Sequence, residues 1–256
     1  MANWSAQALP MSQVLIRSCG NLLLLGRRAV GLTESLWPEL HDEHLGSALL
    51  VVLDPSDTQV SCSMLRMLEV LSPSESMLVL LLLEFEGTGA SLDGRPSPWR
   101  DCFQGSRWLV IQSDHAVWSA PLGLFDLIHA MHLAIGSINA TDLRALRSRY
   151  EGGSTLSCVL EVGHLSAGDH MALFEQMGRS SIDKLNRLSE IPARHITALL
   201  FGDFWQIECS AIEGVMTGLQ SGAPGDINAL TVQTIEHPDK VLLLVLGVLG
   251  HDARTP

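Results

Sequence analysis

The sequence predicts an α/β fold: a Rossmann-like, mainly parallel sheet with helices on both faces, plus a smaller C-terminal mixed α/β domain. Short apolar runs alternate with segments of helical periodicity along the first half of the chain. The runs 48–53 and 77–83 are apolar at every position, which is typical of strands buried on both faces. With 256 residues and 46% hydrophobic content, the chain is long enough to bury a sizeable core.

The stretch from Ser47 to Gly94 predicts a complete parallel β-α-β unit. Its first strand, 47–53, is followed by Asp54-Pro55-Ser56-Asp57, residue types that favour a turn into a helix N-terminus. A helical apolar stripe comes next, and Ser72-Pro73-Ser74 ends the helix. The stripe consists of Met64, Leu65, Met67, Leu68 and Leu71. The following strand, 77–83, is too short to cross a membrane.

The residues before this unit predict a first strand at 13–16 and a helix that begins in the run Leu22–Leu25. Gly20 and Asn21 form the predicted turn between them. A strand, a glycine turn and a helix in this order are what a first nucleotide-binding unit shows. Because only one glycine is present, this pattern is weakly specific.

The alternation of strands and helices continues after the central unit. We predict a strand at 107–111, an apolar helix at 121–135, and a further helix from 143 that is capped by 139–142. The helix at 121–135 carries His129 and His132, which we interpret as residues that flank the core.

The second half of the chain has fewer helices, and its predicted elements are strands at 155–162 and 193–201, helices at 171–177 and 212–220, and strands at 227–235 and 240–249. We predict that the two final strands form a hairpin. Residues 1–139 are thus expected to form a Rossmann-like domain, and residues 140–256 a smaller mixed α/β domain.

The composition excludes two classes of partner. The formal net charge is −12, so phosphate groups of nucleic acids and of anionic membranes are repelled. The N-terminus has neither the basic nor the apolar region of a secretory signal. The five cysteines occur singly, without a Cys-x-x-Cys pair, which favours buried, reduced thiols. We therefore expect a cytoplasmic protein without an integral membrane segment.

Two sets of residues have spacings that would suit a chemical site. His41 and His44 would share one helix face, but no third metal ligand has a defined spacing to them, so we expect no metal. In an α/β enzyme or nucleotide binder, polar residues at the carboxyl ends of the strands would converge on a ligand. These are Ser18, Cys19, Asp54, Asp114 and His115, with Cys19 and His115 as a possible nucleophile and base.

The order of elements over residues 13–250 resembles the FtsZ/tubulin family. The segment 48–87 is similar to that family's phosphate-loop unit, whose second strand ends in a Phe-Glu-Gly triplet, here Phe85-Glu86-Gly87. Ile111-Gln-Ser-Asp114 resembles the family's Ile-Pro-Asn-Asp, and 139–142 its synergy loop. Residues 199–250 resemble its activation domain. The resemblance rests on this collinear order.

The departures from the family pattern concern the nucleotide site. The family's glycine-rich phosphate loop corresponds to Asp54 through Thr58, which contains no glycine. Pro55 lacks a backbone donor and restricts its neighbour, so a backbone cradle cannot form easily. Asp54 and Asp57 would repel a polyphosphate, since unit charges about 4 Å apart interact by roughly 4 kcal/mol at an intermediate dielectric.

The resemblance implies a tubulin/FtsZ-like fold in a degenerate member that has lost GTP binding. We expect no catalysis and no cofactor. The expected role is that of a scaffold or regulator that binds a partner protein or itself, as a homodimer or a filament. The candidate interface residues are Asp54 and Asp57 on one face, and Asn139 and Asp142 on the opposite face. Ordinary turn and helix-capping chemistry is the alternative interpretation of these residues.

Overall fold

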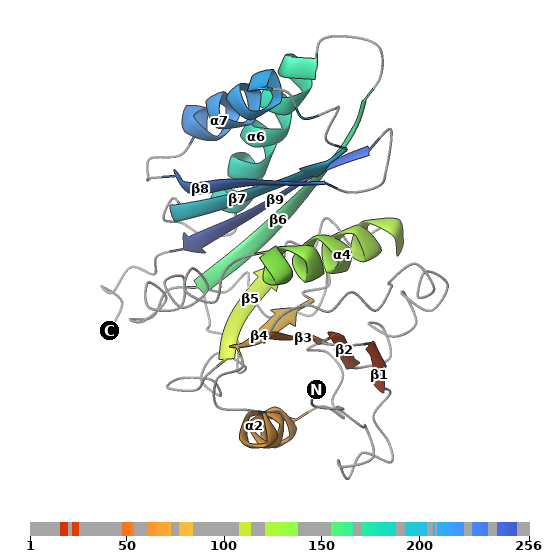
Figure 1. The fold of residues 1–256 in the computed structure, drawn as a ribbon. Helices are drawn as coiled ribbons and strands as arrows, with labels where there is room; N and C mark the ends of the chain where they lie inside the picture. The colour runs from red at the N-terminus through yellow and green to blue at the C-terminus, as the bar shows by residue number, and fades with distance from the viewer. Residues whose placement is uncertain are drawn as a thin grey trace, which may run out of the picture. The chain divides into compact units, whose positions relative to one another are not determined.

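The structure is a computed structural model in which the chain divides into two compact units, Met1–Arg147 and Ser148–Pro256 (Figure 1). The structure describes residues 16–19, 22–25, 48–53, 61–72, 77–83, 108–113, 121–137, 155–165, 170–187, 193–203, 207, 209–222, 227–234 and 240–249. The predicted division into domains 1–139 and 140–256 stays a prediction.

The first unit contains five strands in the order β1-β2-β3-β4-β5. They are β1 (Ile16–Cys19), β2 (Leu22–Leu25), β3 (Ala48–Leu53), β4 (Met77–Leu82) and β5 (Trp108–Ser113). Strands β2 to β5 pair in parallel, whereas β1 is antiparallel to β2. The predicted mainly parallel sheet is confirmed, and its inner strands are apolar because both of their faces are buried.

The predicted helix at Leu22 is wrong, because Leu22–Leu25 is strand β2. A short apolar run fits a buried strand as well as a buried helix, and here Leu22, Leu24 and Leu25 are all buried. β1 and β2 pair antiparallel with Cys19 opposite Leu22. Gly20-Asn21, a dipeptide typical of two-residue hairpins, therefore joins two strands. Residues 13–15 lie outside the described part.

Helices α2 (Cys62–Leu71) and α4 (Pro121–Ser137) lie on opposite sides of this sheet (Figure 1). Leu65 and Leu68 of α2 pack on one face of β3, β4 and β5, and α4 lies near β3. α2 ends before Ser72, as predicted, and the Ser72 N–H donates to Leu68 O at 3.0 Å. The predicted apolar stripe is partly wrong, because Met67 and Leu71 are 41% and 52% exposed.

The second unit contains a four-stranded sheet in the order β6-β9-β7-β8, with two helices. Its elements are β6 (Thr155–His164), α6 (His170–Arg187), β7 (Arg194–Gly202), α7 (Cys209–Gly222), β8 (Ile227–Thr234) and β9 (Lys240–Leu249). β9 is antiparallel to both β6 and β7, and β8 is parallel to β7. The predicted strands and helices from residue 155 onward are confirmed, with ends that differ by up to three residues, except that the helix predicted at 171–177 extends ten residues further, to Arg187. The helix predicted from 143 lies outside the described residues.

The predicted hairpin of the two final strands is wrong, because β9 lies between β6 and β7 and β8 pairs with β7. The reason is the apolar character of β9. Its residues 241–248 are all buried, whichever face of the sheet they occupy. A strand that is apolar on both faces is stable only in the interior of a sheet.

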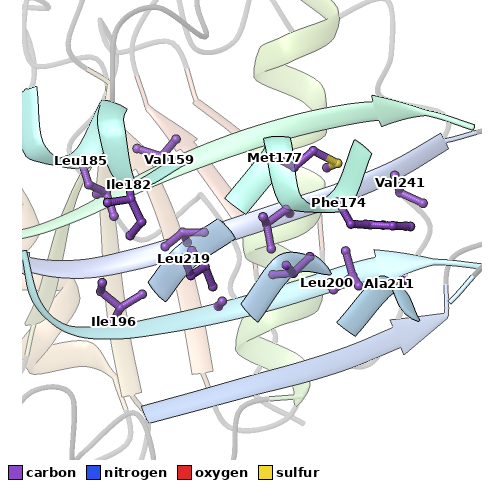
Figure 2. Packing of buried hydrophobic residues seen from close by; sticks show 14 of the residues in the cluster. Val159, Phe174, Met177, Ile182, Leu185, Ile196, Leu200, Ala211, Leu219 and Val241 are labelled. Atoms are coloured by element: carbon purple, nitrogen blue, oxygen red, sulfur yellow. The ribbon is translucent and has the colours of Figure 1, made fainter. Parts of the chain in front are cut away.

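Both helices of the second unit cover one face of its sheet (Figure 2). The strands contribute residues that include Val159, Ile196, Leu200 and Val241 to this core. The helix residues that pack on them are Phe174, Met177, Ile182 and Leu185 of α6, and Ala211 and Leu219 of α7. No described helix is long and apolar enough to cross a membrane.

The cysteines depart from the expectation of buried, reduced thiols. Cys158 is free and buried, as expected. Cys209 is free but exposed at the start of α7, and Cys62 at the start of α2 is disulfide-bonded. Sequence spacing does not report which cysteines come close in the fold, so the disulfide had no signal in the sequence.

Candidate functional site

The carboxyl ends of β3, β4 and β5 form one edge of the first unit's sheet. Leu53 is level with Leu82, and Leu82 with Gln112. The Leu83 N–H donates to Leu53 O at 2.9 Å, and Ser113 Oγ donates to Leu82 O at 3.0 Å. These bonds hold the three strand ends together. Because strands lie about 4.8 Å apart, the segments after β3 and β5 start about 10 Å from each other.

The connection from β3 to α2 starts at this edge and ends at Ser61, the N-cap of α2. Ser61 has extended backbone angles, and its Oγ accepts from the Met64 N–H at 3.4 Å. Its carbonyl oxygen accepts from the same N–H at 3.0 Å. The cap of α2 is therefore Ser61.

The predicted interface residues Asp54, Asp57, Asn139 and Asp142 lie outside the described residues. The framework still fixes where their segments begin. Asp54 follows Leu53 directly, at the carboxyl end of β3. Asn139 lies beyond α4, whose 17 residues span about 25 Å at the usual helical rise.

The convergent site of the alternative prediction is not formed as proposed. Because β1 is antiparallel to β2, its carboxyl end points away from that of β3, and Cys19 is level through Leu22 with Leu50, in the middle of β3. β1 and β5 are also the two outer strands of the five, about 19 Å apart across four strand spacings.

The remaining members of that set, Asp114 and His115, follow β5 outside the described residues, as do His41 and His44. No group of three His, Cys, Asp or Glu side chains in the described ranges is placed to hold a metal ion.

A buried histidine lies on α4. His132 is 6% exposed, and within the described part of the chain its Nε2 has no hydrogen-bond partner. Burial, together with the nearby His129, lowers the pKa of His132 from 6.5 to about 4. His132 is therefore neutral at pH 7. The prediction that it belongs to the core region is confirmed, and its imidazole is too weak a base for acid-base catalysis at that pH.

One polar cluster in the second unit was missed by sequence reasoning. Glu161 of β6 accepts through Oε1 from Ser180 Oγ and pairs with Lys184 Nζ, both at 2.7 Å. Ser180 and Lys184 are one helical turn apart on α6. The cluster is half-buried and joins α6 to β6, so its role is structural. The sequence shows the i, i+4 spacing of Ser180 and Lys184, but it does not show that Glu161 of β6 is their partner.

No protein-family model matches the chain, and no curated protein matches it in sequence. Solved structures do match. CetZ1 from Haloferax volcanii, a GDP-bound monomer, matches with a TM-score of 0.53 and 13% identity over 88% of this chain and 69% of that one. CetZ2 from the same organism, a GTPγS-bound protofilament, matches with a TM-score of 0.50 and 14% identity over 97% of this chain and 82% of that one. An FtsZ variant from M. jannaschii matches with a TM-score of 0.52 and 13% identity over 89% of this chain and 72% of that one.

The chain therefore has a tubulin/FtsZ-like fold, and the similarity at this low identity concerns the fold alone. The resemblance inferred from the order of elements is confirmed at that level.

Proposed function

We propose that this protein is a non-catalytic, tubulin/FtsZ-like scaffold or regulator that has lost GTP binding and acts through self-association or a partner protein. One observation carries the proposal. The connection from β3 to α2, where such a fold would hold phosphate, contains no glycine between Leu53 and Ser61 and does contain Pro55, Asp54 and Asp57. Both its charge and its backbone donors are unsuited to a nucleotide polyphosphate.

The start of α2 supports the same proposal. A helix N-terminus binds phosphate through N–H groups that have no partner in the helix. In α2 the Met64 N–H is already taken by Ser61, through both the hydroxyl and the carbonyl oxygen. The first turn of α2 therefore offers fewer donors than a phosphate-binding helix does. No step of the proposed function uses a nucleotide.

The assembly part of the proposal draws on the fold. CetZ2 from Haloferax volcanii, which has a similar fold, was solved as a protofilament. We propose that this chain also makes head-to-tail contacts, with Asp54 and Asp57 on one surface and Asn139 and Asp142 on the other. The length of α4, about 25 Å, supports two well-separated surfaces.

The cytoplasmic location remains a prediction. The disulfide at Cys62 weighs against it, because structural disulfides are rare in a reducing compartment.

Charge reversal at the loop after β3 tests the proposed contact. The double variant Asp54→Lys/Asp57→Lys should lower the weight-average mass that sedimentation velocity measures without nucleotide at high protein concentration. The control is Asp183→Lys, a single charge reversal of the same kind at an exposed position of α6. It should associate as the wild type does. A chain that stays monomeric at all concentrations and binds no partner protein would contradict the proposal.

An α/β nucleotide-binding protein or enzyme remains the alternative function. Its site would be reduced to Asp54, Asp114 and His115, because Ser18 and Cys19 end a strand that runs opposite to β3 and are level with the middle of β3. A saturable rise in melting temperature with GTP or ATP and magnesium would favour this alternative.

A further inference from the structure

Cys62, the first residue of α2, is joined to another cysteine by a disulfide bond. Cys158 and Cys209 are free thiols. Since the chain has five cysteines, the partner of Cys62 is either Cys19 or Cys102. The register and topology of the first unit distinguish between these two, because they assign the two positions to different faces of the sheet.

The register of β1 assigns position 19 to the face of the sheet that lies away from α2. Cys62 packs against the apolar cluster between α2 and the sheet, to which Leu25 belongs and which Leu23 also contacts. Side chains alternate along a strand, so Leu22 belongs to the other face. Cys19 pairs directly with Leu22, and directly paired residues share a face. Two cysteines whose Cα–Cβ bonds point apart cannot be bridged.

The handedness of crossovers assigns the connection from β4 to β5, residues 83–107, to the same face as α2. β3, β4 and β5 are neighbours in this order and run parallel. Crossovers between parallel strands are right-handed in nearly all proteins, so two crossovers that step in the same direction lie on the same face. The crossover from β3 to β4 contains α2. Cys102 lies in the next crossover and is thus expected on the side of Cys62.

The length of the chain before β5 allows Cys102 to reach the start of α2. Trp108, the first residue of β5, is level with Leu78 near the start of β4. α2 runs back toward this edge of the sheet from the opposite one, and its ten residues span about 15 Å. The six residues from Cys102 to β5 span up to about 20 Å when extended. That length covers the helix from its end to its start.

We propose that Cys62 and Cys102 form a reversible disulfide that ties the connection between β4 and β5 to the start of α2. The bond closes the chain between the two cysteines, which contains α2 and β4, into a covalent loop. A closed loop reduces the conformational freedom of the unfolded chain and so stabilises the fold. The bond is a staple for the first unit. The inference does not depend on the proposed assembly, because the bond can be detected whether or not copies of the chain associate.

The position of Cys62 permits exchange with a dithiol. The residue is partly exposed, so a reductant can reach its sulfur. One thiolate of the dithiol attacks a sulfur of the protein's disulfide, the S–S bond breaks, and the second thiolate then displaces the protein sulfur from the mixed disulfide. Two electrons pass to the chain, which gains two thiols, while the dithiol becomes a disulfide. The positive end of the α2 dipole stabilises negative charge on the Cys62 sulfur as it leaves.

Peptide mapping of the wild-type chain tests the pairing without any substitution. The chain is oxidised with glutathione disulfide, blocked with iodoacetamide in urea, and cut with trypsin without reduction. Each candidate cysteine then lies in a peptide of its own: Cys62 in 29–66, Cys102 in 101–107 and Cys19 in 18–27. We expect 29–66 to be cross-linked to 101–107 and to be released by dithiothreitol. A cross-link to 18–27, or complete alkylation of Cys62 and Cys102, would overturn the proposal.

A matched pair of variants measures the stabilising effect of the bond. In the oxidised chain, Cys102→Ser should lower the melting temperature by roughly 5 to 15 °C, and dithiothreitol should lower it no further. Cys19→Ser makes the same change at the excluded position, and its melting temperature should still fall on reduction as that of the wild type does. If Cys102→Ser does not fold, reduction of the wild type supplies the same comparison. A wild-type melting temperature that dithiothreitol leaves unchanged, or a bond that it opens only in denaturant, would contradict a reversible staple.

Discussion

Replacing Gly218 by alanine should destabilise the second unit, although alanine is the better helix former. Helices α6 and α7 approach each other through glycines. A Cβ added at Gly218 would overlap the carbonyl oxygen of Glu175 and lie 2.8 Å from the backbone nitrogen of Arg179. Both atoms belong to the backbone of α6, so no side-chain rotation can relieve the overlap.

The expected magnitude is the difference between two effects. Glycine to alanine in an exposed helix stabilises by about 1 kcal/mol. Forcing a methyl group into a closely packed contact costs typically about 1 to 3 kcal/mol, and more where rigid backbone must move. A Cβ at Gly178 or Gly214 would also lie close to backbone across the same helix pair, 2.6 Å from Val215 O and 2.7 Å from Met171 O, so the helices cannot separate at one point only. We expect a net loss of roughly 1 to 2 kcal/mol.

Urea denaturation followed by far-UV circular dichroism measures this loss as a lower midpoint. Thr217→Ala is the control, because Thr217 is the preceding residue of α7 and is exposed. It should change the free energy of unfolding by no more than about 0.5 kcal/mol. Gly222→Ala should cost less than Gly218→Ala, since its new methyl group would meet only the Ile182 side chain, with Cγ2 at 2.8 Å. A Gly218→Ala variant as stable as the wild type would refute the close backbone contact.

Two further predictions concern histidines. The pKa of His132 is lowered to about 4 in the folded chain against 6.5 when exposed, so the unfolded chain binds more protons between these pH values. The stabilising contribution of neutral His132 is therefore complete above pH 6.5, and it falls by up to about 3 kcal/mol as the pH drops toward 4. The variant His132→Leu should lack this loss in its pH profile of stability. The control His164→Gln, at an exposed position, should keep it. His195 has a φ of 52°, in the left-handed region, beside the irregularity in register of β7. Calorimetry should show that His195→Gly is tolerated and that His195→Val costs roughly 1 to 2 kcal/mol.

The sequence predicts the β-α-β unit and the elements of the second half because their signals are local. The apolar runs at 48–53 and 77–83 are strands of a parallel sheet, and Ser72 ends α2 as the Ser-Pro-Ser segment indicates. The order of these elements was enough to indicate the tubulin/FtsZ-like fold.

The errors arise where pairing between distant segments decides the structure. Leu22–Leu25 has no periodicity that separates a strand from a helix, and its partner β3 begins at Ala48. β9 does not pair with β8, the strand before it in the sequence, because both faces of β9 are apolar and require an interior position in the sheet. The same limit applies to the candidate site. Glu161 meets Lys184 across a strand and a helix, and no spacing in the sequence reports that contact.

Binding of GTP is the most direct test of the central claim that the segment after β3 does not hold phosphate. The melting temperature of the full chain is measured with increasing GTP in the presence of magnesium. A ligand at 100 times its dissociation constant stabilises by about 2.7 kcal/mol, which for a chain of this size raises the melting temperature by roughly 5 to 10 °C. We predict no saturable rise. A rise of that size, lost on removal of magnesium or on substitution of Asp54, would contradict the account.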